Sequence, residues 1–224
     1  MNIRRSITTV VVALIAIVIA QQAFAFVPWN NPNGTATYFD WFNGGSDTGL
    51  FGSPLLTNGG TSFTFFPQNF RAQSTDGASA QTSDRLQVML VAHPGRVFGQ
   101  IRIQEFGDYG ILNTGQVSAT GGLFLTDLNS GNTLTDTLVT NPVSPISSGQ
   151  GNWTGNVAID LTTQFPEWTS MMVVLDNNLL AISIPGSTTF IEKKVTGAVV
   201  ITPEIPEPAA GLLLLIGLAA LRRR

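Results

Sequence analysis

The sequence predicts an all-β protein whose body is an antiparallel β-sandwich, or a jelly-roll-like arrangement, of about ten strands. Apolar and polar residues alternate along many segments between Phe26 and Ile205, which is the period of strands with one buried face. Gly occurs 23 times and Pro 12 times, and both residues favour turns. Charged residues make up 11% of the 224 residues, against roughly 25% in ordinary soluble domains. This turn-rich, weakly charged composition suits sheets better than helical bundles.

The alternation is clearest over residues 97–105. Ile101 and Ile103 fall on one side of this segment and Arg102 falls on the other, so one face is expected to be buried. Similar patterns predict the remaining strands, and we find no convincing helix in the body. In chain order the strands are expected over residues 35–42, 61–66, 86–92, 97–105, 117–125, 153–161, 171–175 and 179–184, with a last strand marked by Ile191, Val195, Val199 and Ile201.

Turn residues separate several of these segments. Pro94 and Gly95 are the central residues of a His-Pro-Gly-Arg sequence, which predicts a type II turn between two strands. Residues 129–132 and 176–178 are rich in Asn and predict further turns. Residues 68–83 and 142–151 are expected to be longer loops. Neither loop justifies a second core, so residues 26–202 are predicted to form one domain.

Several classes of chemistry are excluded by composition. The chain has no Cys and a single His, His93, which excludes disulfides, thiolate zinc sites, thiol nucleophiles and multi-histidine metal sites. The formal net charge is −3. Between Phe26 and Ile205, however, thirteen acidic residues face six basic ones, so the body carries −7. A body this acidic is not expected to bind nucleic acid.

The first 25 residues are typical of a secretory signal peptide. Arg4 and Arg5 form a positive segment, and an apolar run follows over residues 10–20. Ala23 and Ala25 then provide a small-x-small cleavage site that leaves Phe26 as the new N-terminus. Eleven apolar residues are too few for a membrane span of about 20. The sequence therefore predicts a signal helix, export through the secretion machinery, and cleavage after Ala25.

The last 22 residues, 203–224, have three parts. Pro206, Glu207 and Pro208 lie in a proline-rich segment that resists helix formation. Residues 209–221 carry no charge and predict a short transmembrane helix, about 20 Å long at 1.5 Å per residue. Arg222, Arg223 and Arg224 end the chain and are expected to stay on the cytoplasmic side. This pattern predicts transient anchoring in the inner membrane with the body outside.

The order, spacing and terminal position of these three parts closely resemble the PEP-CTERM sorting signal of exosortase substrates. The resemblance rests on the Pro206-Glu207-Pro208 motif, the apolar segment 209–221 and the arginine cluster 222–224. It implies membrane retention after export, followed by recognition and cleavage near the motif by exosortase. It also implies release to the cell surface or to an exopolysaccharide matrix. The resemblance covers processing and says nothing about the body.

No catalytic constellation is found in the body. No Ser lies in a G-x-S-x-G nucleophile elbow, no phosphate-binding loop is present, and His93 is interpreted as an exposed turn residue. Glu105 and Asp108 suggest a pair of glycosidase carboxylates or part of a calcium site, although capping of a sharp loop explains them more simply. We therefore expect no enzyme activity and no required cofactor, with calcium as the one candidate ion.

The aromatic residues leave two interpretations open. Trp29 and Trp41 could stack against sugar rings, and Trp29, next to Pro28, is expected to be the most exposed. Trp and Phe in strands more often fill the core. The body is therefore expected to serve a structural or adhesive role at the cell surface or in the matrix. The alternative is a carbohydrate- or calcium-binding module, with exopolysaccharide as the partner and Trp29, Trp41, Glu105 and Asp108 as candidate ligand-binding residues.

Overall fold

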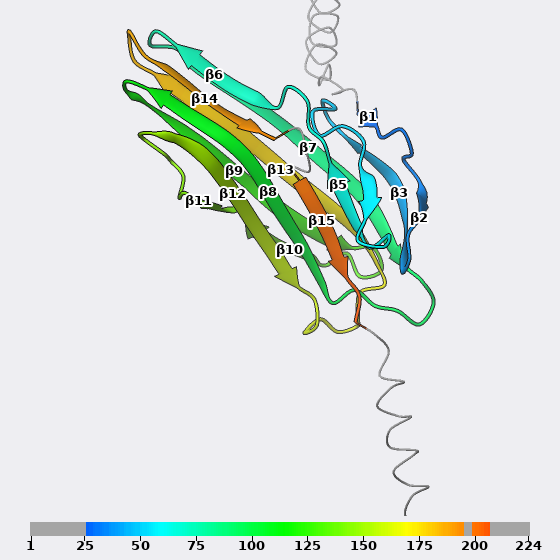
Figure 1. The fold of residues 1–224 in the computed structure, drawn as a ribbon. Coiled ribbons are helices and arrows are strands. Elements are labelled where there is room, and N and C mark those ends of the chain that lie inside the picture. Colours follow the sequence, from blue (N-terminus) through cyan, green and yellow to red (C-terminus); the bar gives the residue numbers. More distant parts are fainter. Residues whose placement is uncertain (1–25, 195–198, 207–224) are drawn as a thin grey trace, which may run out of the picture.

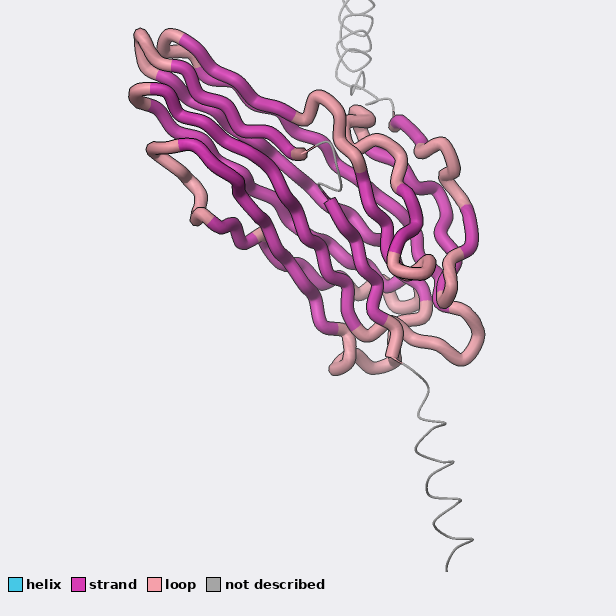
Figure 2. The backbone as a smooth tube through the Cα atoms, in the orientation of Figure 1, coloured by secondary structure: helices cyan, strands magenta, loops and turns pink. Residues whose placement is uncertain are grey.

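The computed structural model describes residues 26–194 and 199–206, and every regular element in those residues is a strand (Figures 1 and 2). The strands form two antiparallel sheets. The seven-stranded sheet has the order β1-β3-β7-β13-β9-β10, with β2 also paired to β3. Its strands are β1 (Val27–Pro28), β2 (Gly34–Thr35), β3 (Phe39–Ser46), β7 (Ser79–Ala92), β9 (Gly115–Asp127), β10 (Thr133–Thr137) and β13 (Ser170–Ser183).

The eight-stranded sheet has the order β11-β12-β8-β15-β5-β4, and β14 pairs with both β8 and β6. Its strands are β4 (Leu55–Thr57), β5 (Ser62–Phe65), β6 (Arg71–Thr75), β8 (Gln100–Leu112), β11 (Val139–Asn141), β12 (Gln150–Asp160), β14 (Thr188–Lys193) and β15 (Val199–Glu204). β14 and β15 lie one after the other along the same edge of β8. The all-β prediction is confirmed for the described residues.

The core lies between the two sheets and is built by the predicted alternation. On β8, Ile101 and Ile103 are fully buried while Arg102 is exposed. On β13 of the other sheet, Val173 and Leu175 face the same core. Because successive side chains point to opposite faces of a sheet, each strand contributes one row to this shared interior and one row to the outer surface.

Three sequence-based expectations about connections are wrong or incomplete. Residues 176–178 do not form a turn, because β13 runs unbroken through them and pairs with β7 and β9 on both sides. Residues 68–83 are not a loop, since they contain β6 and the start of β7. The turn at Pro94 and Gly95 is confirmed by the positive φ of Gly95 and the bond from the Arg96 amide to the His93 carbonyl. The strands on its two sides, however, belong to different sheets.

Asp84 is buried on β7 and organises the turn that follows β3. Its carboxylate accepts hydrogen bonds from the hydroxyl of Ser46 and from the backbone amides of Thr48, Leu50, Phe51 and Arg85. Five donors replace the water that a buried carboxylate loses. This network fixes the chain at the end of β3.

The predicted signal helix and C-terminal transmembrane helix fall on residues 1–25 and 207–224, outside the described residues. In the part of the chain that the structure describes, no helix is long and apolar enough to cross a membrane.

Candidate functional site

The two tryptophans predicted to bind a sugar lie in the core. Trp29 is 3% exposed and Trp41 is 8% exposed. Both rings pack against Phe63, at centroid distances of 5.6 and 5.5 Å. The expected exposure of Trp29 is wrong because Gly44 leaves room for its indole: a Cβ on Gly44 would lie 2.2 Å from the ring. The core-filling interpretation fits both positions.

Trp41 keeps limited contact with the surface. It lines a pocket of about 300 Å³ together with Leu55 and Leu56. Its indole nitrogen donates a hydrogen bond to the carbonyl oxygen of Asn31 at 3.2 Å, so its polar atom is already engaged within the protein. The pocket therefore presents little of Trp41 to a ligand.

Glu105 and Asp108 do not form a carboxylate pair. Glu105 points into the core, whereas Asp108 is partly exposed and forms an ion pair with Lys194 at 3.3 Å. Glu105 and Asp108 are three residues apart on β8, so their side chains point to opposite faces of the sheet. The glycosidase interpretation of this pair therefore has no geometric basis.

Glu105 instead meets Lys193 inside the molecule. The lysine ammonium Nζ lies 2.5 Å from Glu105 Oε2, and both side chains are fully buried. Nζ also lies 5.2 Å from the ring centroid of Phe70, 5.3 Å from that of Trp153 and 6.0 Å from that of Phe51. Burial lowers the pKa of Lys193 below its ordinary 10.5, and the charge of Glu105 opposes that shift.

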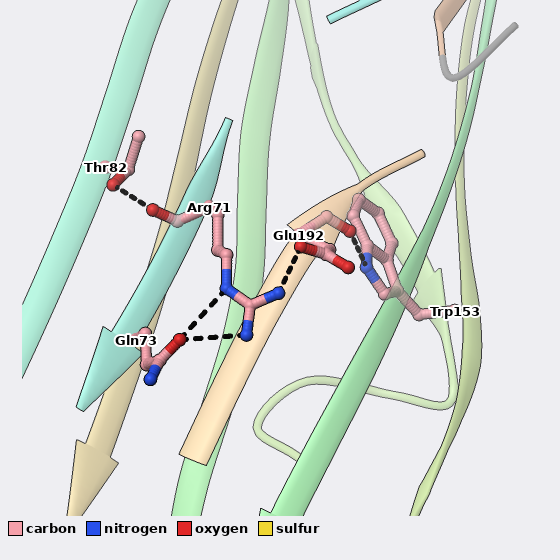
Figure 3. A network of polar contacts seen from close by, with 5 residues as sticks. All are labelled: Arg71, Gln73, Thr82, Trp153 and Glu192. Carbon is pink, nitrogen blue, oxygen red and sulfur yellow. Dashed lines mark hydrogen bonds and ion pairs between the residues drawn. The ribbon is translucent and has the colours of Figure 1, made fainter. Parts of the chain in front are cut away.

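Trp153 is held in this cluster by the backbone of β14. Its indole nitrogen donates to the carbonyl oxygen of Glu192 at 3.0 Å, as Figure 3 shows. The Glu192 side chain points outward and pairs with Arg71 at 2.5 Å, while the next residue, Lys193, points inward. The surface ion pair of Glu192 with Arg71 and the buried pair of Lys193 with Glu105 therefore lie on opposite faces of β14.

A broad groove lies on the outer face of the seven-stranded sheet. This groove has a volume of about 560 Å³. It crosses the sheet from the end of β3 over β7, β13 and β9 to the end of β10, which at the usual strand spacing is roughly 19 Å. The residues that line it include Asp47, Arg85, Thr120, Gly122, Phe124, Thr137, Asp176 and Asn178.

The groove lies where β10 ends. After Thr137 the chain leaves this sheet and continues into β11 of the other sheet. Beyond Gly122 the edge of β9 is bonded to irregular chain, through the Leu138 amide to the Gly121 carbonyl and through the Val117–Ile146 bridge. Gly122, on the outer face with Phe124, carries no side chain to fill the space. The ring of Phe124 leans over Gly122, where a Cβ would lie 3.0 Å from it, and Phe124 is 36% exposed.

The polar groups of the groove come from neighbouring strands. Arg85 on β7 and Asp176 on β13 form an ion pair at 3.4 Å, and both side chains are about half exposed. The side-chain oxygen Oδ1 of Asn178 is buried and has no hydrogen-bond partner among residues 26–194 and 199–206. Because a polar atom without a partner is costly, this oxygen is suited to accept a hydrogen bond from a ligand.

Sequence reasoning missed this groove. Its residues were assigned to a turn at 176–178 or to the strand 117–125, or were given no element, as were Asp47, Arg85 and Thr137. Their proximity depends on the pairing of β13 with β7 and β9. The adjacent glycines at 121 and 122, inside a predicted strand, were the available signal, because glycine in a strand often marks a place where another molecule approaches closely.

The other predicted site residues are placed as follows. Pro206 packs against Gly99, the residue before β8. A Cβ at Gly99 would lie 2.8 Å from the proline ring. Ala23, Ala25, Glu207, Pro208 and Arg222–Arg224 lie outside the described residues. His93 lies 3.3 Å from Asp40. Within residues 26–194 and 199–206, no three Asp, Glu or His side chains gather as metal ligands do.

No protein-family model and no curated protein matches the chain. Among solved structures, it is similar to TmCBM61 in complex with β-1,4-galactotriose, with a TM-score of 0.27 and 12% identity over 78% of this chain and 97% of that chain. A mutant of the family 29 carbohydrate-binding module CBM29-2 has a TM-score of 0.21 and 11% identity, over 79% and 89%. The VP2 subviral particle of infectious bursal disease virus has a TM-score of 0.27 and 14% identity, over 72% and 49%. Similarities this low do not indicate what this chain binds.

Proposed function

We propose that this is a non-catalytic, exported protein of the cell surface or exopolysaccharide matrix, and that its β-sandwich binds a polysaccharide in the groove on the seven-stranded sheet. The groove is the observation that supports binding. It is long and open, as a chain of sugar rings requires, and too extended for a single ion. Phe124 offers an apolar ring face, and Asp176, Arg85 and Asn178 offer hydrogen-bonding groups. Such a mixture of one aromatic surface and a few polar groups is typical of small-ligand sites.

The groove also has the electrostatic character that a neutral or weakly charged sugar chain needs. Arg85 and Asp176 pair with each other, so neither charge must be stripped of water without a partner. Asp47 and Asp84 leave the lining acidic, which disfavours an acidic polysaccharide. Sugar hydroxyls both donate and accept hydrogen bonds. A hydroxyl that donates to Asn178 Oδ1 would satisfy a buried acceptor, and such unmet acceptors cost about 1–3 kcal/mol.

Binding is tested with protein purified from the producing cells and titrated with their own exopolysaccharide in a calorimeter. Phe124→Ala should weaken binding by about two- to twelvefold, since loss of one aromatic contact costs about 0.5–1.5 kcal/mol. Asp176→Asn should weaken it less. The matched control is Phe106→Ala, because Phe106 is 37% exposed on the outer face of the other sheet. Equal loss in both Phe variants, or no binding by the unaltered protein, would contradict the groove as the binding site.

A titration with calcium tests the alternative, in which the body is a calcium-binding module. If calcium at millimolar concentration raised the melting temperature of the protein, an ion would be a ligand of the folded state. No change, together with binding of the polysaccharide, favours the groove. Absence of both responses would leave a purely structural or adhesive role.

The export and sorting part of the proposal rests on residues 1–25 and 203–224. Intact-mass measurement on protein released by the producing cells should show that residues 1–25 and the segment after the Pro206 motif are missing. A released chain that still ends in Arg222-Arg223-Arg224 would contradict processing by exosortase.

A further inference from the structure

Lys193 and Glu105 are a nucleophile and a carboxyl group in direct contact, shielded from water. Nζ lies 2.5 Å from Oε2, and neither side chain is exposed. We propose that these two side chains condense to an intramolecular amide, a covalent cross-link between β14 and β8. Nothing in the proposed polysaccharide binding requires this pair, which faces the interior between the sheets.

The surroundings of the pair favour its uncharged form. The rings of Phe51, Phe70 and Trp153 surround Nζ, and the second carboxylate oxygen, Oε1, has no hydrogen-bond partner among the described residues. An ion pair with half of its carboxylate unsatisfied is poorly compensated for the water it has lost. Transfer of a proton from the ammonium to the carboxylate removes both charges. Burial also lowers the pKa of Lys193, which favours the amine that can act as a nucleophile.

The reaction needs no other reactant. The lone pair of the neutral Lys193 amine attacks the carboxyl carbon Cδ of protonated Glu105 and forms the new C–N bond. The C–O bond to one carboxyl oxygen then breaks. That oxygen leaves as water with its own proton and one proton from the attacking nitrogen. The products are one amide and one water molecule, and no electron is gained or lost overall.

Strand register holds the two groups together before any bond forms. Lys193 lies opposite Gly107 in the β14–β8 ladder, and Glu105 precedes Gly107 by two residues, on the same face. Diagonal neighbours of this kind are within reach of long side chains. Groups oriented in this way react as if at effective concentrations up to about 10⁵–10⁸ M, which can offset the unfavourable condensation of amines with acids in water.

Gly107 makes the arrangement possible. A Cβ at this position would lie 2.0 Å from the Glu192 carbonyl oxygen and 2.2 Å from the Trp153 indole nitrogen. Without a side chain, Gly107 lets the indole lie across β8 and cover Lys193. The adjacent pair of Lys194 and Asp108 also places an amino group beside a carboxylate, at 3.3 Å, but both side chains are about 40% exposed. Water stabilises these charges, so this pair remains an ion pair and is a natural control.

Peptide mapping of the unaltered protein from its producing cells tests the proposal directly. There is no Lys or Arg between Arg102 and Lys193, so trypsin places both residues in one peptide, 103–193. The amide would block cleavage after Lys193 and extend this peptide to Lys194, and its mass would be lower than calculated by one water molecule. A protease that cleaves after acidic residues should then release two peptides that remain joined through Glu105 and Lys193. An unmodified peptide 103–193, cleaved after Lys193, would overturn the proposal.

Variants confirm the assignment. The double variant Glu105→Leu/Lys193→Met removes both reacting groups while keeping the interior apolar, and it should abolish the mass deficit. Lys194→Met should keep the deficit, because its pair with Asp108 is not involved. Loss of the deficit in Lys194→Met would contradict the assignment. If the double variant fails to fold, the peptide masses of the unaltered protein still decide. These masses do not depend on polysaccharide binding, so the two proposals fail independently.

Discussion

Asp84 and Glu105 are both buried carboxylates, one in each sheet, and they are solvated in opposite ways. Asp84 receives five hydrogen bonds, four of them from backbone amides. Within the described part of the chain, Glu105 receives one, from Lys193, and its other oxygen receives none. The first carboxylate is surrounded by dipoles that keep its charge stable. The second has one close partner, the Lys193 amino group, and an aromatic surround, which makes it suited to chemistry rather than to holding a turn.

The largest effect is expected from Lys193→Met. This change leaves the Glu105 carboxylate buried without a partner and should lower the free energy of unfolding by about 3–5 kcal/mol. The cross-link would also be lost. Urea denaturation followed by tryptophan fluorescence measures the change.

The double variant Glu105→Leu/Lys193→Met distinguishes an ion pair from a covalent cross-link. If the pair were only an ion pair, apolar replacement would be neutral or stabilising. If it is cross-linked, the double variant should remain less stable than the unaltered protein, because an 88-residue loop is no longer closed in the unfolded chain. A double variant as stable as the unaltered protein would contradict the cross-link.

Asp84→Ala should cost about 3 kcal/mol, because several buried amides lose their acceptor at once. Asp84→Asn should cost less, since one side-chain oxygen still accepts hydrogen bonds. Denaturant titration compares the two variants. An equal loss in both would mean that the charge, and not the number of hydrogen bonds, determines the role of Asp84.

Gly107→Ala tests the space beside Lys193. The added methyl group would collide with the Glu192 carbonyl and with Trp153, and overpacking of this kind costs about 1–3 kcal/mol. Gly151→Ala on the paired strand β12 is the control, because its nearest contact would be an ordinary 3.8 Å. Thermal melting should separate the two variants, and similar melting temperatures would argue against tight packing at Gly107.

The smallest effect concerns an exposed carboxylate, Asp160. The backbone amide and the hydroxyl of Thr162 donate to Asp160 and lower its pKa below the ordinary 3.8. Its contribution to stability is therefore present above pH 3.8 and is lost as the pH falls through the lower value of the folded state. Asp160→Asn should flatten the acid side of the stability curve slightly. An unchanged curve would show that the exposed carboxylate contributes nothing measurable.

The periodicity of the sequence was sufficient to place Glu105 and Lys193 on the buried faces of their strands. β8 begins at Gln100, so the predicted alternation holds over residues 100–105, where Glu105 falls in phase with Ile101 and Ile103. It does not hold over residues 97–99, where Phe98 is buried. Lys193 likewise falls in phase with Ile191. A charged residue in an apolar register was therefore the signal for a buried pair, although Glu105 was interpreted as a loop residue.

What sequence reasoning could not supply was the long-range pairing. The contact of Glu105 with Lys193 depends on β14 lying beside β8, and the groove depends on β13 lying between β7 and β9. The Asn-rich residues 176–178 have turn chemistry, but pairing on both sides keeps them in a strand. The turn preference of these residues is thus overridden by hydrogen bonds to the two neighbouring strands, as often happens in sheets.

The position of β15 has a mechanical consequence. β15 is the last described strand, and it is hydrogen-bonded to β8 on one side and to β5 on the other. A pull on the chain beyond Pro206 would act along β15 and load these ladders in shear, so many hydrogen bonds would resist together instead of opening one at a time. With Glu105 joined to Lys193, tension that dislodged β15 would pass through this link into β8 and leave residues 106–192 outside the force path. A protein built in this way could be held by its C-terminal end without losing the fold of most of its body.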